Sequence, residues 1–212
     1  MRKVWDLDNQ FNDSGEWNPG DQFTSWLRVS VTDKWGIANA GGIRTLAAGN
    51  NGQRSPSGNY ACVVLVSNLI KSQWDNPWKD QLVDNESRLE YWGDAKSSKN
   101  KKAENWPGNK ALISVNDYFI LKKAKKVPPF LYFQRKKKGE VTFKGLFGMQ
   151  DLRKEFFHDI NHNEDILNYR GYFNKIENCV DSSWIIQRAL KGVDDSQLTP
   201  IGWLEYQKSI TL

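Results

Sequence analysis

The chain has few of the residues that build metal centres and disulfide scaffolds. Only two cysteines, Cys62 and Cys179, and two histidines, His158 and His162, occur among 212 residues. Neither cysteine has metal-ligand spacing, and the apolar run around Cys62 is typical of a buried free thiol. Two histidines alone do not make a zinc site. We therefore expect no metal and no cofactor.

Long apolar segments are also missing. The sequence has no apolar run near 18 residues and no signal peptide, which argues against a membrane span and against secretion. Together with the scarcity of cysteine, this predicts a protein of the reducing cytoplasm with no membrane partner. The length suits one domain over residues 1–212, with a core at about 20–177 and C-terminal helices at about 182–207.

Positive charge is in modest excess and is clustered. The 30 Lys and Arg against 25 Asp and Glu give a net charge of +5 and a pI of about 9.1, which favours a polyanionic partner. Each basic run alone is equally compatible with a solvated turn, but three runs around one aromatic segment indicate a phosphate-binding face. The runs are Lys99, Lys101 and Lys102; Lys122, Lys123, Lys125 and Lys126; and Arg135, Lys136, Lys137 and Lys138.

Hydrophobic periodicity predicts a mixed α+β fold, with strands in the middle and helices toward both ends. Residues 36–59 are rich in Gly, Asn, Ser and Pro, and they predict a long loop interrupted at 43–45. A basic turn joins two of the strands into a hairpin. The expected strands are 61–67, 87–92, 130–133, 140–148 and 166–177, and the expected helices are 20–31, 110–121, 182–190 and 201–206.

The segment from Tyr91 to Lys96, which reads Tyr-Trp-Gly-Asp-Ala-Lys, is the most informative part of the sequence. An aromatic strand ends at Gly93, where glycine allows a sharp turn that lets Asp94 project into a cleft. Two chemistries use a carboxylate in such a place. One is hydrogen-bond readout of a nucleobase edge beside stacking aromatic rings, and the other is metal-dependent phosphodiester cleavage by an acid-x-lysine element.

The cleavage hypothesis requires a second, upstream acid, and Asp84 lies ten residues before Asp94. In nucleases of the PD-(D/E)xK type the acid-x-lysine element lies inside a hydrophobic strand, whereas here Lys96 begins a polar loop. Catalysis by Asp84, Asp94 and Lys96 is therefore the weaker alternative, and we expect no catalytic residue in this chain. A third hypothesis is a protein that recognises a DNA sequence in the groove, or one that binds backbone-modified DNA. In either case Asp94 and the tryptophans would have structural roles.

Several short motifs, taken in order, resemble a known family. They are Asn39 to Arg44, Val63 to Val66, Asp75 to Trp78, Tyr91 to Lys96, Pro107 to Asn109, Val127 to Phe133, Phe143 to Leu146 and Asn168 to Arg170. Over roughly residues 20–207 the series looks like the N-terminal DNA-binding domain of AspBHI-type, Mrr-related, modification-dependent restriction endonucleases. The resemblance implies a fold similar to the SET-and-RING-associated (SRA) domain, with a curved, mostly antiparallel β-sheet or barrel and flanking helices.

The same resemblance implies a function. The partner would be double-stranded DNA carrying 5-methylcytosine or a related modification, which is recognised by flipping the base out of the duplex. A fused or partner nuclease domain would then cut the DNA. The chain itself would be the recognition part of a restriction system.

The chemistry of base flipping assigns candidate roles. A flipped cytosine presents an exocyclic amine, and Asp94 is the candidate acceptor. Aromatic rings replace the lost stacking, worth about 1–3 kcal/mol per base, and Tyr91, Trp92, Trp78 and Trp106 compete for these positions. The candidates for contacts to the DNA backbone are Arg44, Lys96, Lys99, Lys101, Lys102, Lys110, Arg135, Lys136, Lys137 and Lys138.

Overall fold

The computed structural model describes residues 2–3, 16–17, 22–24, 42–48, 59–70, 79–97, 101–137, 140–160, 162–192, 194 and 197–212. The strands in this part of the chain are β1 (Arg2–Lys3), β2 (Glu16–Trp17), β3 (Gln22–Thr24), β4 (Gly42–Ala47), β5 (Tyr60–Asn68), β6 (Gln81–Val83), β7 (Arg88–Trp92), β8 (Phe130–Lys137), β9 (Glu140–Asp159), β10 (Glu164–Glu177) and β11 (Val180–Asp181). The α-helices are α1 (Pro107–Ile120), α2 (Ser182–Lys191) and α3 (Ile201–Thr211).

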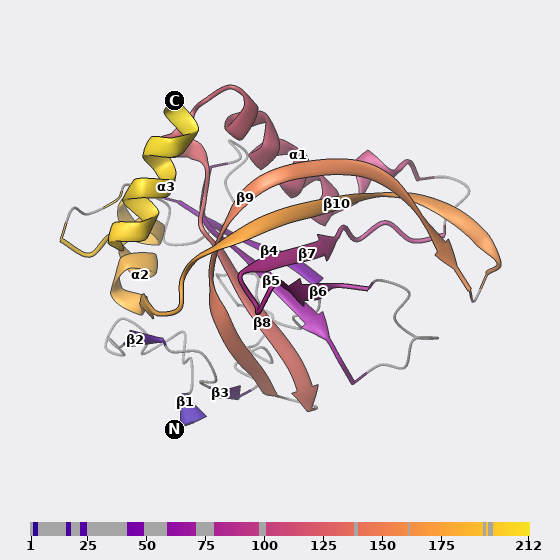
Figure 1. Cartoon of the computed structure of the whole chain (residues 1–212), viewed down its shortest axis with the longest axis horizontal. Helices are drawn as coiled ribbons and strands as arrows, with labels where there is room; N and C mark the ends of the chain where they lie inside the picture. The colour runs from indigo at the N-terminus through magenta and orange to yellow at the C-terminus, as the bar shows by residue number, and fades with distance from the viewer. Residues whose placement is uncertain are drawn as a thin grey trace.

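One large sheet dominates the structure. Its strands follow the order β4-β5-β8-β9-β10-β7-β6, and β3 pairs with both β1 and β9. All pairs are antiparallel except β5 with β8 and β1 with β3. The long strands β9 and β10 form a hairpin that curves over the molecule (Figure 1). These observations confirm the predicted α+β class with a curved, mostly antiparallel sheet, and the described strands leave that sheet open between β4 and β6.

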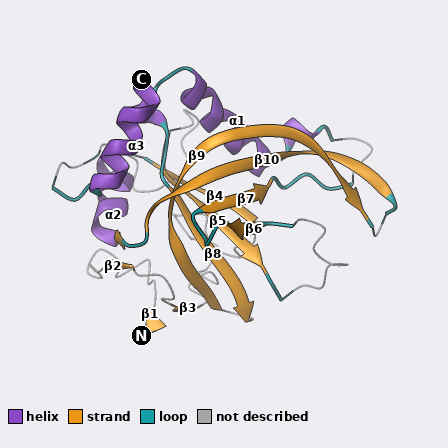
Figure 2. Cartoon of the chain, viewed as in Figure 1, coloured by secondary structure: helices purple, strands orange, loops and turns teal. Residues whose placement is uncertain are grey.

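The sheet is buried on both faces at its centre, which explains the unbroken apolar run of β5. Successive side chains of a strand point to opposite faces. Val64 packs in one cluster with Trp184 of α2, whereas Val63 packs in another cluster with Leu112 of α1. Helices α1 and α2 therefore cover opposite faces of the same central strands (Figure 2).

The two C-terminal helices form a compact aromatic layer. Trp184 of α2 and Trp203 of α3 are fully buried, with their ring centroids 5.9 Å apart. The ring centroids of Tyr206 and Trp203 are 5.0 Å apart, and the Tyr206 hydroxyl donates a hydrogen bond of 2.5 Å to the carbonyl of Met149 in β9. These contacts fasten α3 to the sheet. None of the described helices is long and apolar enough to cross a membrane.

Most elements predicted from the sequence are confirmed, namely the strands β5, β7, β8 and β10 and all three α-helices. The predicted helix at 20–31 is wrong at Gln22–Thr24, where β3 pairs with β9, and the rest of that range lies outside the described residues. The predicted loop at 36–59 contains β4, and β9 continues beyond 148 to Asp159. In these places pairing with a neighbouring strand overrides the local sequence preference.

The aromatic layer predicts where the fold is most sensitive to mutation. Trp203→Ala should lower the free energy of unfolding by about 3–5 kcal/mol, because it leaves a large cavity between α2 and the sheet. Leu212→Ala is the matched control, because Leu212 is 94% exposed, and it should change stability by less than about 0.5 kcal/mol. Urea unfolding of both variants measures the difference, and equal stabilities would show that the layer is not part of the core.

Candidate functional site

A cavity of about 480 Å³ lies where β7 ends and the chain leads toward α1. This volume falls within the usual range for small-molecule and base-sized ligands. The structure brings seven of the sequence-predicted site residues together in its lining. They are Arg44, Tyr91, Trp92, Asp94, Lys96, Lys101 and Trp106.

Asp94 lies in the cavity wall and also caps helix α1. One carboxylate oxygen accepts the backbone N–H of Gly108 at 2.8 Å, and the other accepts that of Asn109 at 3.0 Å. A carboxylate at a helix N-terminus satisfies donors that have no partner within the helix and complements the helix dipole. Both oxygens therefore already serve the fold, and the role of Asp94 as the acceptor for a base amine stays a prediction.

Glycine is required at position 93 because the Asn109 side chain lies very close to its Cα atom, and not because of an unusual backbone angle. A Cβ atom at this position would lie 1.7 Å from Oδ1 of Asn109, and the backbone of Gly93 is not in the left-handed region. The expected sharp glycine turn is therefore replaced by a tight contact. The fully buried Asn109 and Asn168 complete the junction, since Asn109 donates to Asn168 at 2.9 Å and Asn168 donates to the carbonyl of Gly93 at 3.0 Å.

Aromatic side chains form firm walls of the cavity. Tyr91 is only 2% exposed, and its hydroxyl donates to the carbonyl of Val66 at 3.0 Å. The ring of Trp92 packs against Phe157 with a centroid separation of 5.8 Å. Trp106 is half-buried and carries the ammonium group of Lys101 4.0 Å from its ring centre. The fourth aromatic candidate, Trp78, lies outside the described residues.

The cavity holds a second carboxylate, Asp80, which the sequence did not single out. Its Oδ1 accepts the backbone N–H of Trp92, and its Oδ2 accepts the hydroxyl of Ser67, both at 2.9 Å. Burial raises the pKa of Asp80 to about 7, although these hydrogen bonds and the charge of Arg170 act in the opposite direction. The sequence signal was weak, because Asp80 precedes the short strand β6, which was not predicted.

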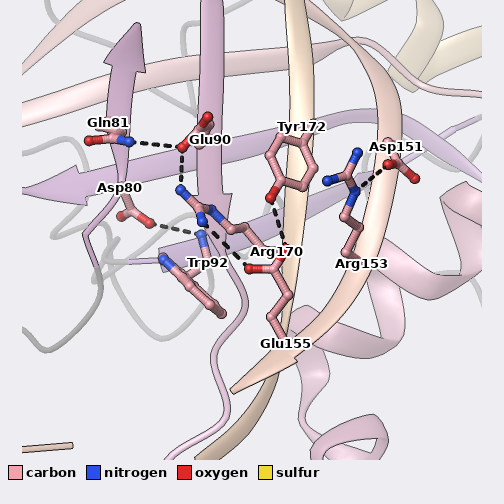
Figure 3. A network of polar contacts seen from close by, with 9 residues as sticks. All are labelled: Asp80, Gln81, Glu90, Trp92, Asp151, Arg153, Glu155, Arg170 and Tyr172. Atoms are coloured by element: carbon pink, nitrogen blue, oxygen red, sulfur yellow. Dashed lines mark hydrogen bonds and ion pairs between the residues drawn. The ribbon is translucent and has the colours of Figure 1, made fainter. Parts of the chain in front are cut away.

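A network of charged side chains stands against Trp92. Arg170 of β10 lies 5.2 Å from the Trp92 ring centre and 5.5 Å from that of Tyr172, and it forms ion pairs with Glu90 and Glu155 (Figure 3). Tyr172 donates to Glu155 at 2.8 Å. The Arg170 side chain is only 22% exposed, so the network holds one face of the Trp92 indole in a partly buried environment.

The predicted DNA-backbone residues divide into two groups. Lys102 joins Lys96 and Lys101 around a second hollow of about 490 Å³, which shares Trp106 with the cavity. Lys110 is exposed on α1, Lys136 is exposed at the end of β8, and burial lowers the pKa of the half-buried Arg135. Nothing is described for Lys99 and Lys138 or for the side chain of Lys137.

The residues of the nuclease hypothesis do not come together. Asp84 lies in the exposed turn before β7 and forms an ion pair with Arg88 at 2.8 Å, whereas Asp94 follows the other end of that strand. The five residues of β7 alone span roughly 17 Å. Among the described residues there is also no cluster of three His, Cys, Asp or Glu side chains that could hold a metal ion.

Three solved structures have a similar fold. The DNA modification-dependent restriction endonuclease AspBHI has a TM-score of 0.70 and 19% sequence identity, and the match covers 99% of this chain and 53% of that one. The DNA recognition domain of the cytosine modification-dependent restriction endonuclease LpnPI has a TM-score of 0.68 and 20% identity, with 98% of this chain and 93% of that one covered. The MspJI restriction endonuclease in complex with a 27-mer oligonucleotide has a TM-score of 0.64 and 19% identity, with 92% of this chain and 52% of that one covered. The chain thus spans about half the length of AspBHI and MspJI and nearly all of the LpnPI domain.

Sequence comparison identifies the class of protein. Residues 5–211 match the family described as the restriction endonuclease AspBHI N-terminal domain, and the chain belongs to this family. This confirms the family that the order of sequence motifs had indicated. No curated protein sequence matches the chain.

The charged network predicts an unequal response of two neighbouring arginines. Arg170→Met should lower the free energy of unfolding by about 3 kcal/mol, because it leaves Glu90 and Glu155 without their shared cation in a partly buried site. Arg153→Met is the matched control. Its ion pair with Asp151 is exposed, so its loss should cost less than about 1 kcal/mol. Chemical unfolding of both variants decides, and equal losses would mean that Arg170 is no more important than a surface charge.

Proposed function

We propose that this chain binds double-stranded DNA and holds a flipped, modified cytosine in the cavity at the end of β7. The observation that carries the proposal is the convergence of aromatic walls, two carboxylates and lysines on one cavity of about 480 Å³. AspBHI is described as DNA modification-dependent and LpnPI as cytosine modification-dependent, which supports the same class of ligand for a related chain.

Asp80 is the proposed reader of the base edge. Cytosine presents an amine donor at N4, and an ionised carboxylate offers only acceptors. Among the described residues each oxygen of Asp80 has one hydrogen-bond partner, so further lone pairs are proposed to receive the base. Asp94 has the same count of partners, but they are the donors of a helix terminus. Asp80 is therefore preferred for the base, and Asp94 for shaping the cavity.

The remaining lining suits the other parts of a modified cytosine. Trp92 and Tyr91 provide aromatic surface, and Trp106 provides another that Lys101 covers. Stacking on such rings compensates for the stacking lost from the duplex. The apolar residues Ile43 and Val66 also line the cavity, and we propose them as the surroundings of a 5-methyl group.

The basic residues around the cavity would hold the DNA backbone. Lys96, Lys101 and Lys102 are exposed beside the cavity entrance, and Lys110 is exposed on α1 nearby. Such contacts fix the register of the DNA without reading its sequence. We propose no cleavage by this chain itself. It would act in the cytoplasm as the recognition part of a restriction endonuclease, with a nuclease domain fused or recruited to it.

Substitution of the two carboxylates tests the assignment. Asp80→Ala should reduce the preference for 5-methylcytosine over cytosine by about 10- to 150-fold, since a hydrogen bond to a charged group is worth about 1.5–3 kcal/mol. Binding to unmodified duplex should persist, because phosphate contacts supply it. Asp94→Ala should have the smaller effect on preference. Competition binding on one duplex with cytosine, 5-methylcytosine or 5-hydroxymethylcytosine at a single position measures these differences.

Two results would change the assignment. If Asp94→Ala loses the preference and Asp80→Ala keeps it, Asp94 reads the base edge as the sequence predicted. If both variants fold, as judged by thermal melting, and both keep the full preference, the chain reads DNA from the groove without using this cavity.

A further inference from the structure

A partly buried chain of hydrogen bonds leads from the central strands to Asp80. Nε2 of Gln134 donates to the hydroxyl oxygen of Tyr132 at 3.3 Å. The Tyr132 hydroxyl donates to Oγ of Ser67 at 3.0 Å, and the Ser67 hydroxyl donates to Oδ2 of Asp80 at 2.9 Å. We call Gln134, Tyr132 and Ser67 the relay.

The chemistry of Asp80 fixes the direction of the relay. An ionised carboxylate can only accept, so Ser67 must donate to it, and the oxygen of Ser67 is then left to accept from Tyr132. Burial raises the pKa of Tyr132 to about 12, so its hydroxyl keeps its proton at neutral pH and can donate. Every bond of the relay therefore points toward the carboxylate, and donors aligned in this way strengthen one another.

The sheet holds the relay in place. Strands β5 and β8 are parallel, and their register pairs Ser67 with Gln134. Tyr132 and Gln134 are two residues apart and so project from the same face of β8. Ser67 is 2% exposed and Tyr132 is fully buried. The Tyr132 ring is wedged between Tyr91 and Phe147, with centroid separations of 6.3 and 5.9 Å. The relay is thus part of the packed central strands of the sheet.

We propose that Ser67, Tyr132 and Gln134 are positioning residues, which hold the Asp80 carboxylate in the orientation that a flipped base requires. The relay restrains Oδ2, and the backbone N–H of Trp92 restrains Oδ1. A carboxylate fixed at both oxygens presents its remaining lone pairs in a set direction and loses no conformational freedom when the base arrives. The inference rests on the proposed function, because it concerns how Asp80 performs that role.

The relay also has a consequence for protonation. Among the described residues, the titratable and charged groups that act on Asp80 or line its cavity are Tyr132, Tyr91 of β7, Arg170 of β10, Arg44 of β4, and Asp94, Lys96 and Lys101. The Ser67 hydrogen bond favours the ionised carboxylate and so lowers the pKa of Asp80. Without the Tyr132 hydroxyl this bond weakens and the pKa rises. More Asp80 is then protonated at pH 7, and raising the pH restores the acceptor.

Tyr132→Phe tests the relay by removing one hydroxyl group. The matched control is Tyr206→Phe, which removes a hydroxyl that is also largely buried and bonded to the carbonyl of Met149, outside the cavity. The first readout is the titration of the Asp80 side-chain carbon by NMR without DNA, assigned with Asp80→Asn. The second is competition between a duplex with one 5-methylcytosine and the same duplex unmodified, from pH 6.5 to 9.

The Asp80 titration should move to higher pH in Tyr132→Phe and stay in place in Tyr206→Phe. The preference for 5-methylcytosine at pH 7 should fall roughly 2- to 10-fold, the effect of one neutral hydrogen bond. It should recover only in part toward pH 9, because raising the pH restores the charge of Asp80 but not its restraint. If Tyr132→Phe does not fold, Ser67→Ala tests the same link.

The two readouts separate the two hypotheses. An unchanged Asp80 titration in a folded Tyr132→Phe protein overturns the relay, whatever happens to DNA binding. A shifted titration with an unchanged preference at every pH leaves the hydrogen bonds intact as a structural feature, but it overturns the role of Asp80 in reading the base. A loss of preference that recovers completely at high pH overturns positioning, because it shows that only the charge of Asp80 had changed and not its orientation.

Discussion

The cavity exists because the first turn of α1 is fastened to the end of β7. Asn109 is fully buried and uses its whole side chain there, since it accepts the N–H of Asp94 and donates to Asn168 and to the carbonyl of Ala103. Asp94 returns the contact by capping the helix, and Gly93 leaves the space that Asn109 occupies. Because a buried amide without a hydrogen-bond partner costs stability, the loss of one partner would destabilise the whole junction.

Two other parts of the structure depend on that junction. It positions the loop that carries Lys101 and Trp106 at the cavity, and it positions the apolar face of α1 on the sheet through Leu112 and Val115. The segment from Tyr91 to Lys96, which resembles a functional motif in the sequence, therefore has a largely structural role. The same residues shape the site by holding its walls at fixed positions.

The electrostatic environment of Asp80 is a second constraint on the cavity. Burial disfavours the ionised form of Asp80, and the donors around it, together with the charge of Arg170, offset only part of that penalty. A carboxylate in this state gains from each additional donor, so an amine entering the cavity meets a strong acceptor. Arg170 itself forms ion pairs with Glu90 and Glu155, which hold its guanidinium group against the Trp92 ring.

Periodicity predicted the elements whose apolar pattern is regular, such as β5 and α1, and the order of motifs predicted the family. Periodicity did not predict the far half of β9, where Arg153 and Lys154 are exposed and only pairing with β10 defines the strand. Asp80 was missed for a related reason. Its partners Ser67 and Trp92 lie 13 and 12 residues away, and only the folded sheet brings them to it.

The central claim is that a base leaves the duplex and enters the cavity beside Asp80. Photo-crosslinking tests it most directly, with 5-iodocytosine at the recognised position of a duplex, because the iodine takes the place of the methyl group and reacts with nearby aromatic rings. Mass spectrometry should locate the adduct on Tyr91, Trp92 or Trp106. Adducts found only on residues outside the cavity, with specific binding retained, would contradict base flipping into this site.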